Sequence, residues 1–148
     1  MKILSLALLL FLVASSLFVA ENLKLNSHLD YTSDSLDGPL ITGDNMATGL
    51  AAGKPNYIII YGEACYNSKR QARRTVDLYN KYRGRVNFVV IDLDAHSSAE
   101  QEQLRKRFYR GYIPHVVVLS KNGTALYDSS GEVDSQRIET IFERALAE

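Results

Sequence analysis

The sequence predicts an α/β protein, a three-layer α/β/α sandwich around a central mixed sheet of roughly four to five strands. Two observations predict this class. Short runs of β-branched and aromatic residues alternate with longer amphipathic stretches, as in chains whose parallel strands are joined by helices. The last two apolar runs flank Asn122-Gly123, a dipeptide typical of tight hairpins, so part of the sheet should be antiparallel.

The composition limits the classes of partner. The chain has 148 residues, a length typical of one domain. Its 17 basic and 17 acidic residues give a formal net charge of zero. A balanced charge provides no general attraction for nucleic acid or for an anionic membrane surface. We therefore expect no nucleic-acid partner, and any electrostatic argument must rest on local groups of charges.

The first residues predict export. Lys2 precedes an uncharged apolar run over residues 3–20, the pattern of a signal peptide. Because about 20 apolar residues span a bilayer, residues 1–20 are either a cleaved signal peptide or a retained N-terminal membrane anchor. Either alternative delivers the rest of the chain to an extracytoplasmic compartment, which is the periplasm, a lumen or the exterior. Membrane contact is expected only through residues 3–20, if they are retained.

The exported part is expected to have two regions. Residues 21–43 are rich in Ser, Asp and Asn and have no sustained hydrophobic period, so they predict a polar spacer. Residues 44–148 predict the folded domain. At its start, the apolar residues Met46 and Leu50 indicate a short helix that is capped by Asp44 or Asn45.

The remaining elements follow in order. The continuous apolar run over 57–61 predicts a strand that is covered on both faces. A helix is expected over 67–83, a second apolar strand over 86–93 and a second helix over 98–109.

The last third of the chain predicts a hairpin and a closing helix. Strands over 115–119 and 125–127 flank the Asn-Gly turn. The closing helix should begin at Asp134 or Ser135 and bury one face. The apolar residues of that face are Ile138, Ile141, Phe142 and Leu146.

Three stretches in this order, GKPNYIIIYGEAC, VNFVVIDLD and GYIPHVVVLSKNGTALY, resemble the thioredoxin family over about residues 45–147. The specific elements are Cys65-x-x-Ser68 after a strand and at a helix start, and the Ile113-Pro114 step that opens a later strand. Within the family, the chain looks most like exported or membrane-anchored thioredoxin-like proteins. The resemblance implies a thioredoxin-like sandwich and a thiol site at Cys65. It also implies a cis Pro114 that exposes the backbone of Ile113 to an extended partner peptide.

The chain departs from the family pattern at four positions. Ser68 stands where the second cysteine would be, which makes the site a monothiol CxxS. Ile59 and Val90 stand where the family usually has a buried acid and a lysine. Ala64 replaces the customary tryptophan before the cysteine. The first three departures affect sulfur and proton transfer, so ordinary dithiol reductase chemistry is not expected.

The single thiol can have one of two roles. Cys65 is the only cysteine, so it is either a buried structural thiol or it reacts with other molecules. Amides at a helix start favour a thiolate, and so do nearby basic residues such as Lys69 and Arg70, whereas Glu63 opposes it. Ser68 cannot resolve a mixed disulfide, although its hydroxyl could hydrogen-bond a thiolate.

These considerations give the predicted site. Cys65 and Ser68 are the candidate catalytic residues. The candidate substrate-binding residues are Ala64, Tyr66, Ile113 and Pro114. The expected function is thiol-disulfide exchange through one sulfur, as in an isomerase or a deglutathionylating protein. The expected partners are exported proteins with thiols or disulfides, or small thiols such as glutathione. The alternative is a redox-inactive thioredoxin-fold module that only docks partner peptides.

No cofactor and no metal site is expected. His115 could approach Cys65 and complete a metal site, but a hydrogen bond to a backbone carbonyl accounts for it more simply. His28 and His96 have no neighbours at the spacing of metal ligands. A monomer is expected, with a disulfide-linked dimer through Cys65 as the alternative.

Overall fold

The computed structural model describes residues 22–46 and 48–148. Its central sheet has four strands in the order β4-β3-β5-β6. The strands are β3 (Asn56–Tyr61), β4 (Asn87–Asp92), β5 (His115–Leu119) and β6 (Ala125–Ser130). β3 pairs with β4 in parallel and with β5 antiparallel, and β5 pairs with β6 antiparallel. The sheet is therefore mixed, as predicted.

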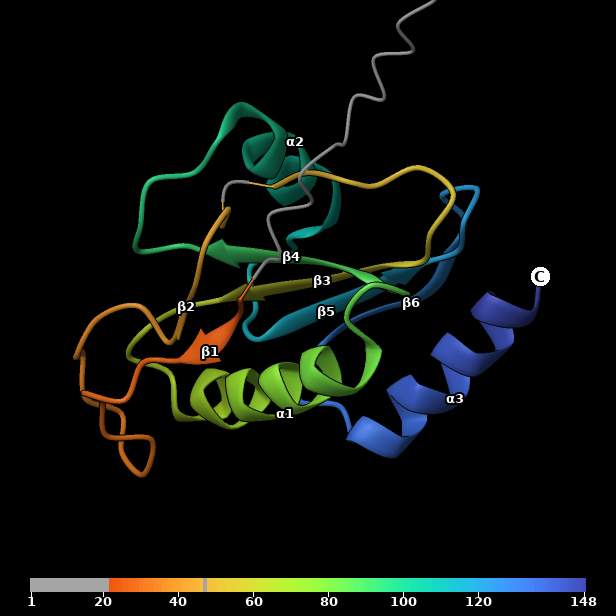
Figure 1. Ribbon diagram of the computed structural model, residues 1–148. Helices are drawn as coiled ribbons and strands as arrows, with labels where there is room; N and C mark the ends of the chain where they lie inside the picture. The colour runs from red at the N-terminus through yellow and green to blue at the C-terminus, as the bar shows by residue number, and fades with distance from the viewer. Residues whose placement is uncertain (1–21, 47) are drawn as a thin grey trace, which may run out of the picture.

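Helices cover both faces of this sheet (Figure 1). α1 (Tyr66–Tyr82) and α3 (Ser135–Ala147) lie on one face, and α2 (Ala99–Phe108) lies on the other. Alternate residues of β3 enter two separate cores, because neighbouring side chains of a strand point to opposite faces. Ile59 packs in the core under α1 and α3, whereas Ile58 and Ile60 pack in the core under α2. The three-layer α/β/α sandwich is confirmed.

The predicted helix boundaries agree with the structure to within a few residues. Gly84 follows α1 with a φ of 85°, a left-handed conformation that glycine adopts without strain. Ser98 and Gln101 form a reciprocal capping box at the start of α2. The Asp134 side chain accepts a hydrogen bond from the Gln136 N–H at the start of α3. Short-range capping signals in the sequence are thus sufficient to set these boundaries.

The segment before the domain differs from the prediction. The described residues 22–43 fold against the rest of the protein and do not form a polar spacer. β1 (Lys24–Leu25) and β2 (Ile41–Thr42) pair antiparallel beside α1. Leu23 and Leu40 are buried in the same core as Ile59. These apolar residues are too widely spaced to give a periodic signal, yet they anchor both ends of the segment. The predicted signal peptide or anchor, 1–20, lies outside the described residues.

The short helix predicted near Met46 is also wrong, because the described residues on both sides of position 47 are not helical. Amide side chains from the rest of the domain bind the backbone here instead. Gln101 donates a hydrogen bond to the carbonyl of Met46 at 2.7 Å, and Asn87 donates one to Gly49 at 3.0 Å. Side-chain partners that are distant in sequence therefore replace the hydrogen bonds of a helix.

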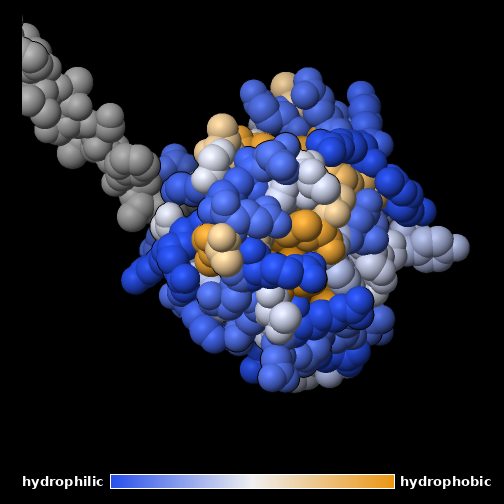
Figure 2. All heavy atoms as spheres, turned by 90° about the vertical axis from the view of Figure 1, so that its right-hand side faces the viewer, coloured by the Kyte–Doolittle hydropathy of each residue, from blue (hydrophilic) through white to orange (hydrophobic). Residues whose placement is uncertain are grey.

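One face of the molecule is mainly polar. Figure 2 shows one face of the molecule on which hydrophilic side chains predominate around a small hydrophobic area. In the part of the chain that the structure describes, no helix has the length and apolar character that a membrane crossing requires.

Candidate functional site

Cys65 lies on the turn that leads from β3 into α1. Its backbone is extended, with φ −89° and ψ 118°, and it is the N-cap residue of α1. Its N–H donates to the Gly62 carbonyl at 3.3 Å, and its carbonyl accepts from the Lys69 N–H at 3.0 Å. The residue is half-buried and forms no disulfide. The residue as a whole is therefore not fully buried.

The loop before β5 packs against the same turn. The Ile113–Pro114 peptide bond is cis, as the resemblance implies. A Cβ atom placed on Gly62 would lie 2.6 Å from Ile113 Cδ1, a distance that real contacts do not show. Only a glycine therefore permits this close approach. Gly62 and Ile113 bring together the turn that carries the thiol and the loop that carries the proline.

The other predicted substrate-binding residues lie on the thiol turn itself. Ala64 is exposed and Tyr66 is half-buried. The guanidinium of Arg70 lies 4.5 Å from the centre of the Tyr66 ring, which fixes that ring on the first turn of α1. On the loop before β5, Tyr112 is 73% exposed. Tyr112 is not among the predicted site residues, although it is the most exposed aromatic side chain beside the proline.

Ser68 is placed differently from what the prediction requires. It is completely buried on α1, and its Oγ has no hydrogen-bond partner among the described residues. The expected hydrogen bond between Ser68 and the Cys65 sulfur is therefore not formed here. A buried hydroxyl without a partner is uncommon, and it leaves a donor available on the first turn of α1.

The interior below the thiol is apolar. Ile59 and Val90 are direct partners in the register of β3 and β4, and both are buried. These are the positions at which the resemblance would place an acid and a lysine. No ionisable side chain at these two positions can take up or release a proton.

Ionisable groups gather instead just beyond β3 and β4. The Glu63 N–H donates to Asp94 Oδ2 at 2.8 Å. Burial, and then the neighbouring carboxylate of Asp92, raise the pKa of Glu63 to about 7. Burial also raises the pKa of Asp92, whose Oδ2 is buried without a hydrogen-bond partner among the described residues. From the sequence, Glu63 is expected only to oppose a thiolate by its charge, because the burial of its side chain comes from tertiary packing.

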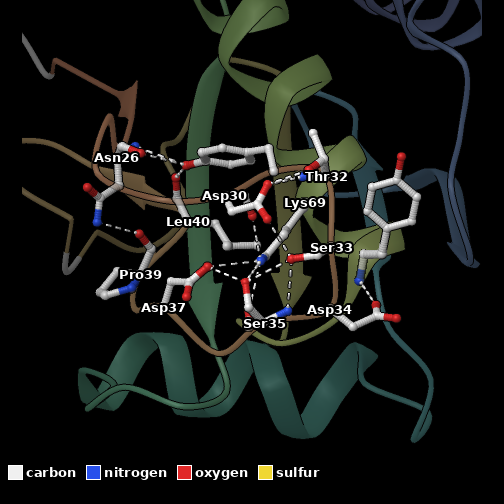
Figure 3. A network of polar contacts seen from close by, with 12 residues as sticks. Asn26, Asp30, Thr32, Ser33, Asp34, Ser35, Asp37, Pro39, Leu40 and Lys69 are labelled. Carbon is white, nitrogen blue, oxygen red and sulfur yellow. Dashed lines mark hydrogen bonds and ion pairs between the residues drawn. The ribbon is translucent and has the colours of Figure 1, made fainter.

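Residues 26–40, which we call the N-terminal loop, clamp α1 through Lys69 (Figure 3). The Lys69 side chain is completely buried. Its ammonium donates hydrogen bonds to the Asp30 carbonyl at 2.6 Å and to the Ser35 carbonyl at 2.8 Å. It also forms an ion pair with Asp37 at 3.4 Å. The prediction that Lys69 favours a thiolate at Cys65 is not supported, because these oxygens already surround its charge.

The N-terminal loop also caps α1. Asp34 Oδ1 accepts a hydrogen bond from the Tyr66 N–H at 2.7 Å (Figure 3). Tyr66 is the first residue of α1 and directly follows Cys65. Asp34 thus places a carboxylate at the positive end of the helix dipole, next to the thiol. No local pattern predicts a contact between residues so far apart in the sequence.

Two more basic residues of α1 are paired. The Arg70 guanidinium and the Arg74 guanidinium both bind the Glu132 carboxylate, the latter at 2.8 Å. The hydrogen bond from Arg70 lowers the pKa of Glu132. The basic stretch that looked free in the sequence is therefore largely neutralised on this side of α1.

His115 is held by side chains and not by the expected backbone carbonyl. It is buried, with Nε2 2.7 Å from Asp128 Oδ1 and Nδ1 2.8 Å from Ser130 Oγ. The carboxylate of Asp128 also lies 3.9 Å from the guanidinium of Arg110. Among the residues that the structure describes, no group of three or more His, Cys, Asp or Glu side chains could hold a metal ion.

Comparisons with known proteins agree with this geometry. No family model matches the chain. The thiol:disulfide interchange protein TxlA homolog of Synechocystis sp. is 34% identical over 87 residues. The match covers 59% of this chain and 47% of that protein, so the chain spans about half the length of the curated relative.

Solved thioredoxin structures share the fold. Chloroplastic thioredoxin z matches with a TM-score of 0.53 and 21% identity, over 65% of this chain and 81% of that one. Thioredoxin-2 of the malaria parasite matches with a TM-score of 0.52 and 21% identity, over 62% and 82%. With the mixed sheet, the cysteine at the start of α1 and the cis-proline before β5, these matches show that the chain has the thioredoxin fold and is similar to a thiol:disulfide interchange protein.

Proposed function

We propose that the protein carries out thiol-disulfide exchange outside the cytoplasm through the single thiol of Cys65. One observation carries the proposal. The half-buried Cys65 lies at the start of α1, on a turn that packs against the Ile113–Pro114 loop. A sulfur in this position can meet a partner disulfide, and the adjoining loop offers backbone groups to which an extended peptide can pair.

The reaction needs an external thiol. The Cys65 thiolate attacks one sulfur of a partner disulfide, forms a mixed disulfide and releases the other sulfur as a thiolate. A second thiolate from outside the protein then attacks the mixed disulfide and returns Cys65 to the thiolate form. Ser68 cannot take this second role, because it has no sulfur. Repeated cycles would rearrange disulfides or remove a small thiol from a protein.

The partners we propose are exported proteins with thiols or disulfides, with small thiols to resolve the mixed disulfides. Ile113 and Pro114 would align the partner backbone, while Ala64 and Tyr66 would contact the residues beside its cysteine. The apolar, uncharged run over residues 3–20 supports the extracytoplasmic location. The name of the Synechocystis relative, a thiol:disulfide interchange protein, supports the chemistry.

The test is formation and resolution of a mixed disulfide in the folded protein. The purified protein is mixed with a disulfide-linked model peptide, and the adduct is followed by mass spectrometry. We expect one peptide to be added at Cys65 and to be removed by an added thiol, with no adduct on a Cys65→Ser variant. If the folded protein forms no adduct while the urea-unfolded chain does, the proposal is overturned.

A redox-inactive docking module is the second candidate. The apolar pair Ile59 and Val90 and the absence of a resolving sulfur at Ser68 favour it, because nothing at these positions assists proton or sulfur transfer. The two candidate functions differ in whether partner capture depends on the Cys65 sulfur. A Cys65→Ser variant that captures the same exported proteins as the parent, with equal affinity, would favour the docking module.

A further inference from the structure

We propose that the N-terminal loop and the acidic groups beside it make Cys65 selective for cationic partner segments and unfavourable for anionic thiols such as glutathione. The inference rests on the proposed function and names its substrate class: polypeptide segments in which Lys or Arg lies next to the reacting cysteine. The acidic groups are Asp30, Asp34, Asp37 and Asp94.

Three donors near the thiol that could hold an anionic ligand are already used. The first amide of α1, on Tyr66, donates to Asp34 at 2.7 Å. The Lys69 ammonium is buried among oxygens of the N-terminal loop. The Glu63 N–H donates to Asp94 at 2.8 Å. An incoming carboxylate would have to displace an internal partner before it could bind to any of these three donors.

The guanidinium of Arg70, five residues after Cys65 on α1, is also engaged. It donates through Nε to both oxygens of Glu132 at 3.0 Å, and it stacks on Tyr66. Arg74 shares the same Glu132 carboxylate. Arg70, Arg74 and Glu132 together carry a formal charge of +1, whereas Asp30, Asp34, Asp37 and Asp94 with Lys69 carry a formal charge of −3.

The four acidic side chains face solvent. Asp30, Asp34, Asp37 and Asp94 are all exposed. Hydrogen bonds from Thr32 and Ser33 lower the pKa of Asp30 to about 2, and a hydrogen bond from Ser35 lowers the pKa of Asp37. These two groups therefore carry full negative charge at neutral pH.

One of the four lies very close to the thiol. Because the Tyr66 nitrogen is bonded to the carbonyl carbon of Cys65, covalent geometry puts the Asp34 oxygen within roughly 7 Å of the sulfur. This distance is shorter than the Debye length of about 10 Å at 0.1 M salt, so a charged reagent at the sulfur senses Asp34. A cationic partner is attracted by this field, and an anionic one is repelled.

The experiment uses two methanethiosulfonate reagents of equal size, one with a trimethylammonium group and one with a sulfonate group. In both, the Cys65 thiolate attacks the sulfenyl sulfur, a disulfide forms and methanesulfinate leaves. The ratio of the two rates is divided by the ratio for the urea-unfolded chain. We expect the cationic reagent to be favoured by roughly three- to tenfold at low ionic strength, and the preference to fall toward one in 1 M salt.

Matched variants identify the groups responsible. Asp34→Asn keeps an oxygen that can accept from the Tyr66 N–H but removes the charge, and Asp94→Asn does the same for the Glu63 N–H. Each should lower the preference by about twofold. The control is Asp77→Asn, which removes an exposed charge of α1 that lies about 16 Å or more along the helix from Cys65. This variant should leave the preference for the cationic reagent unchanged.

Each outcome has a definite meaning. Equal rates, or faster reaction with the sulfonate reagent, would overturn the selectivity and leave the proposed exchange function in place. Failure of the folded protein to react with either reagent would overturn both the selectivity and the proposed exchange function. A preference that is not lowered at all when Asp34→Asn and Asp94→Asn are combined would also overturn the assignment, because the two carboxylates nearest the thiol would then contribute nothing to it.

Discussion

Asp34 accepts a hydrogen bond from the N–H of Tyr66 at 2.7 Å, so a residue of the N-terminal loop caps the helix that begins beside Cys65. The Cys65 side chain itself makes no capping hydrogen bond. The loop therefore supplies the cap that the cysteine does not supply. This relationship joins the stability of the fold to the surroundings of the thiol.

Loss of the Asp34 cap should lower stability. An Asp34→Ala variant leaves the first amide of α1 without its carboxylate partner, and we expect a loss of about 1 kcal/mol in the free energy of unfolding. Asp34→Asn keeps an acceptor and should lose clearly less. Urea unfolding followed by circular dichroism measures both. Equal stability of the alanine variant and the parent would show that the cap contributes nothing.

Lys69 should be far more important to stability than an exposed lysine. A Lys69→Met variant leaves the carbonyls of Asp30 and Ser35 without their donor, and we expect a loss of about 2–3 kcal/mol. The N-terminal loop should also become sensitive to proteolysis, because its main anchor is gone.

The matched control is Lys81→Met on the same helix. Lys81 is 56% exposed and pairs with Glu139 at 2.7 Å, so its loss should cost less than about 1 kcal/mol. Similar losses for the Lys69 and Lys81 variants, or an N-terminal loop that stays resistant to protease in Lys69→Met, would contradict the clamp.

Glu63 should make stability depend on pH. Its pKa is raised to about 7 in the folded state from an ordinary value of 4.5, so between these values the folded protein holds a proton that the unfolded chain has released. Stability should therefore fall as pH rises from about 5 to 7 and should level off above pH 7. A decrease of about 1–3 kcal/mol is expected.

A Glu63→Gln variant tests this assignment. It removes the titrating group and should flatten the profile of unfolding free energy against pH between 5 and 8. Asp92 has a raised pKa as well and contributes a slope of the same sign, so a smaller dependence should remain. A profile as steep as that of the parent would assign the titration to another group.

Gly62 and Ile113 should be energetically coupled. A Gly62→Ala variant places a methyl group 2.6 Å from Ile113 Cδ1, and we expect a loss of about 1 kcal/mol because this flexible side chain can partly move away. Ile113→Val removes the atom that clashes. The double variant should therefore lose less stability than the sum of the two single variants, as a double-mutant cycle would measure. Strict additivity would show that the turn and the loop are not in the predicted contact.

Local sequence patterns were sufficient for most of the fold. The apolar run of β3 and the capping residues of α2 each act over a few residues, so the sequence shows them directly. The cysteine and proline of the site came from the family resemblance. The fold of the N-terminal loop could not be predicted, because the loop binds Lys69 through backbone carbonyls. Every residue has a carbonyl, so no sequence pattern indicates this contact. For the same reason a lysine that looked exposed is completely buried.

The distribution of charge around the thiol could not be predicted from the sequence either. Lys69 and Arg70 appeared to favour an anion, because sequence neighbours share a helix end. Their actual partners, Asp37 and Glu132, lie more than thirty residues away along the chain. Only the tertiary structure shows that internal carboxylates take up this positive charge.

Reaction of the folded protein with iodoacetamide tests the central claim most directly, namely that the Cys65 sulfur is reachable. The rate of alkylation in buffer is compared with the rate in urea, at concentrations of urea that span the unfolding transition. We predict that the native state is alkylated at a rate within about tenfold of the unfolded rate, and that this rate changes little below the unfolding transition. Alkylation that occurs only as the protein unfolds globally would contradict it.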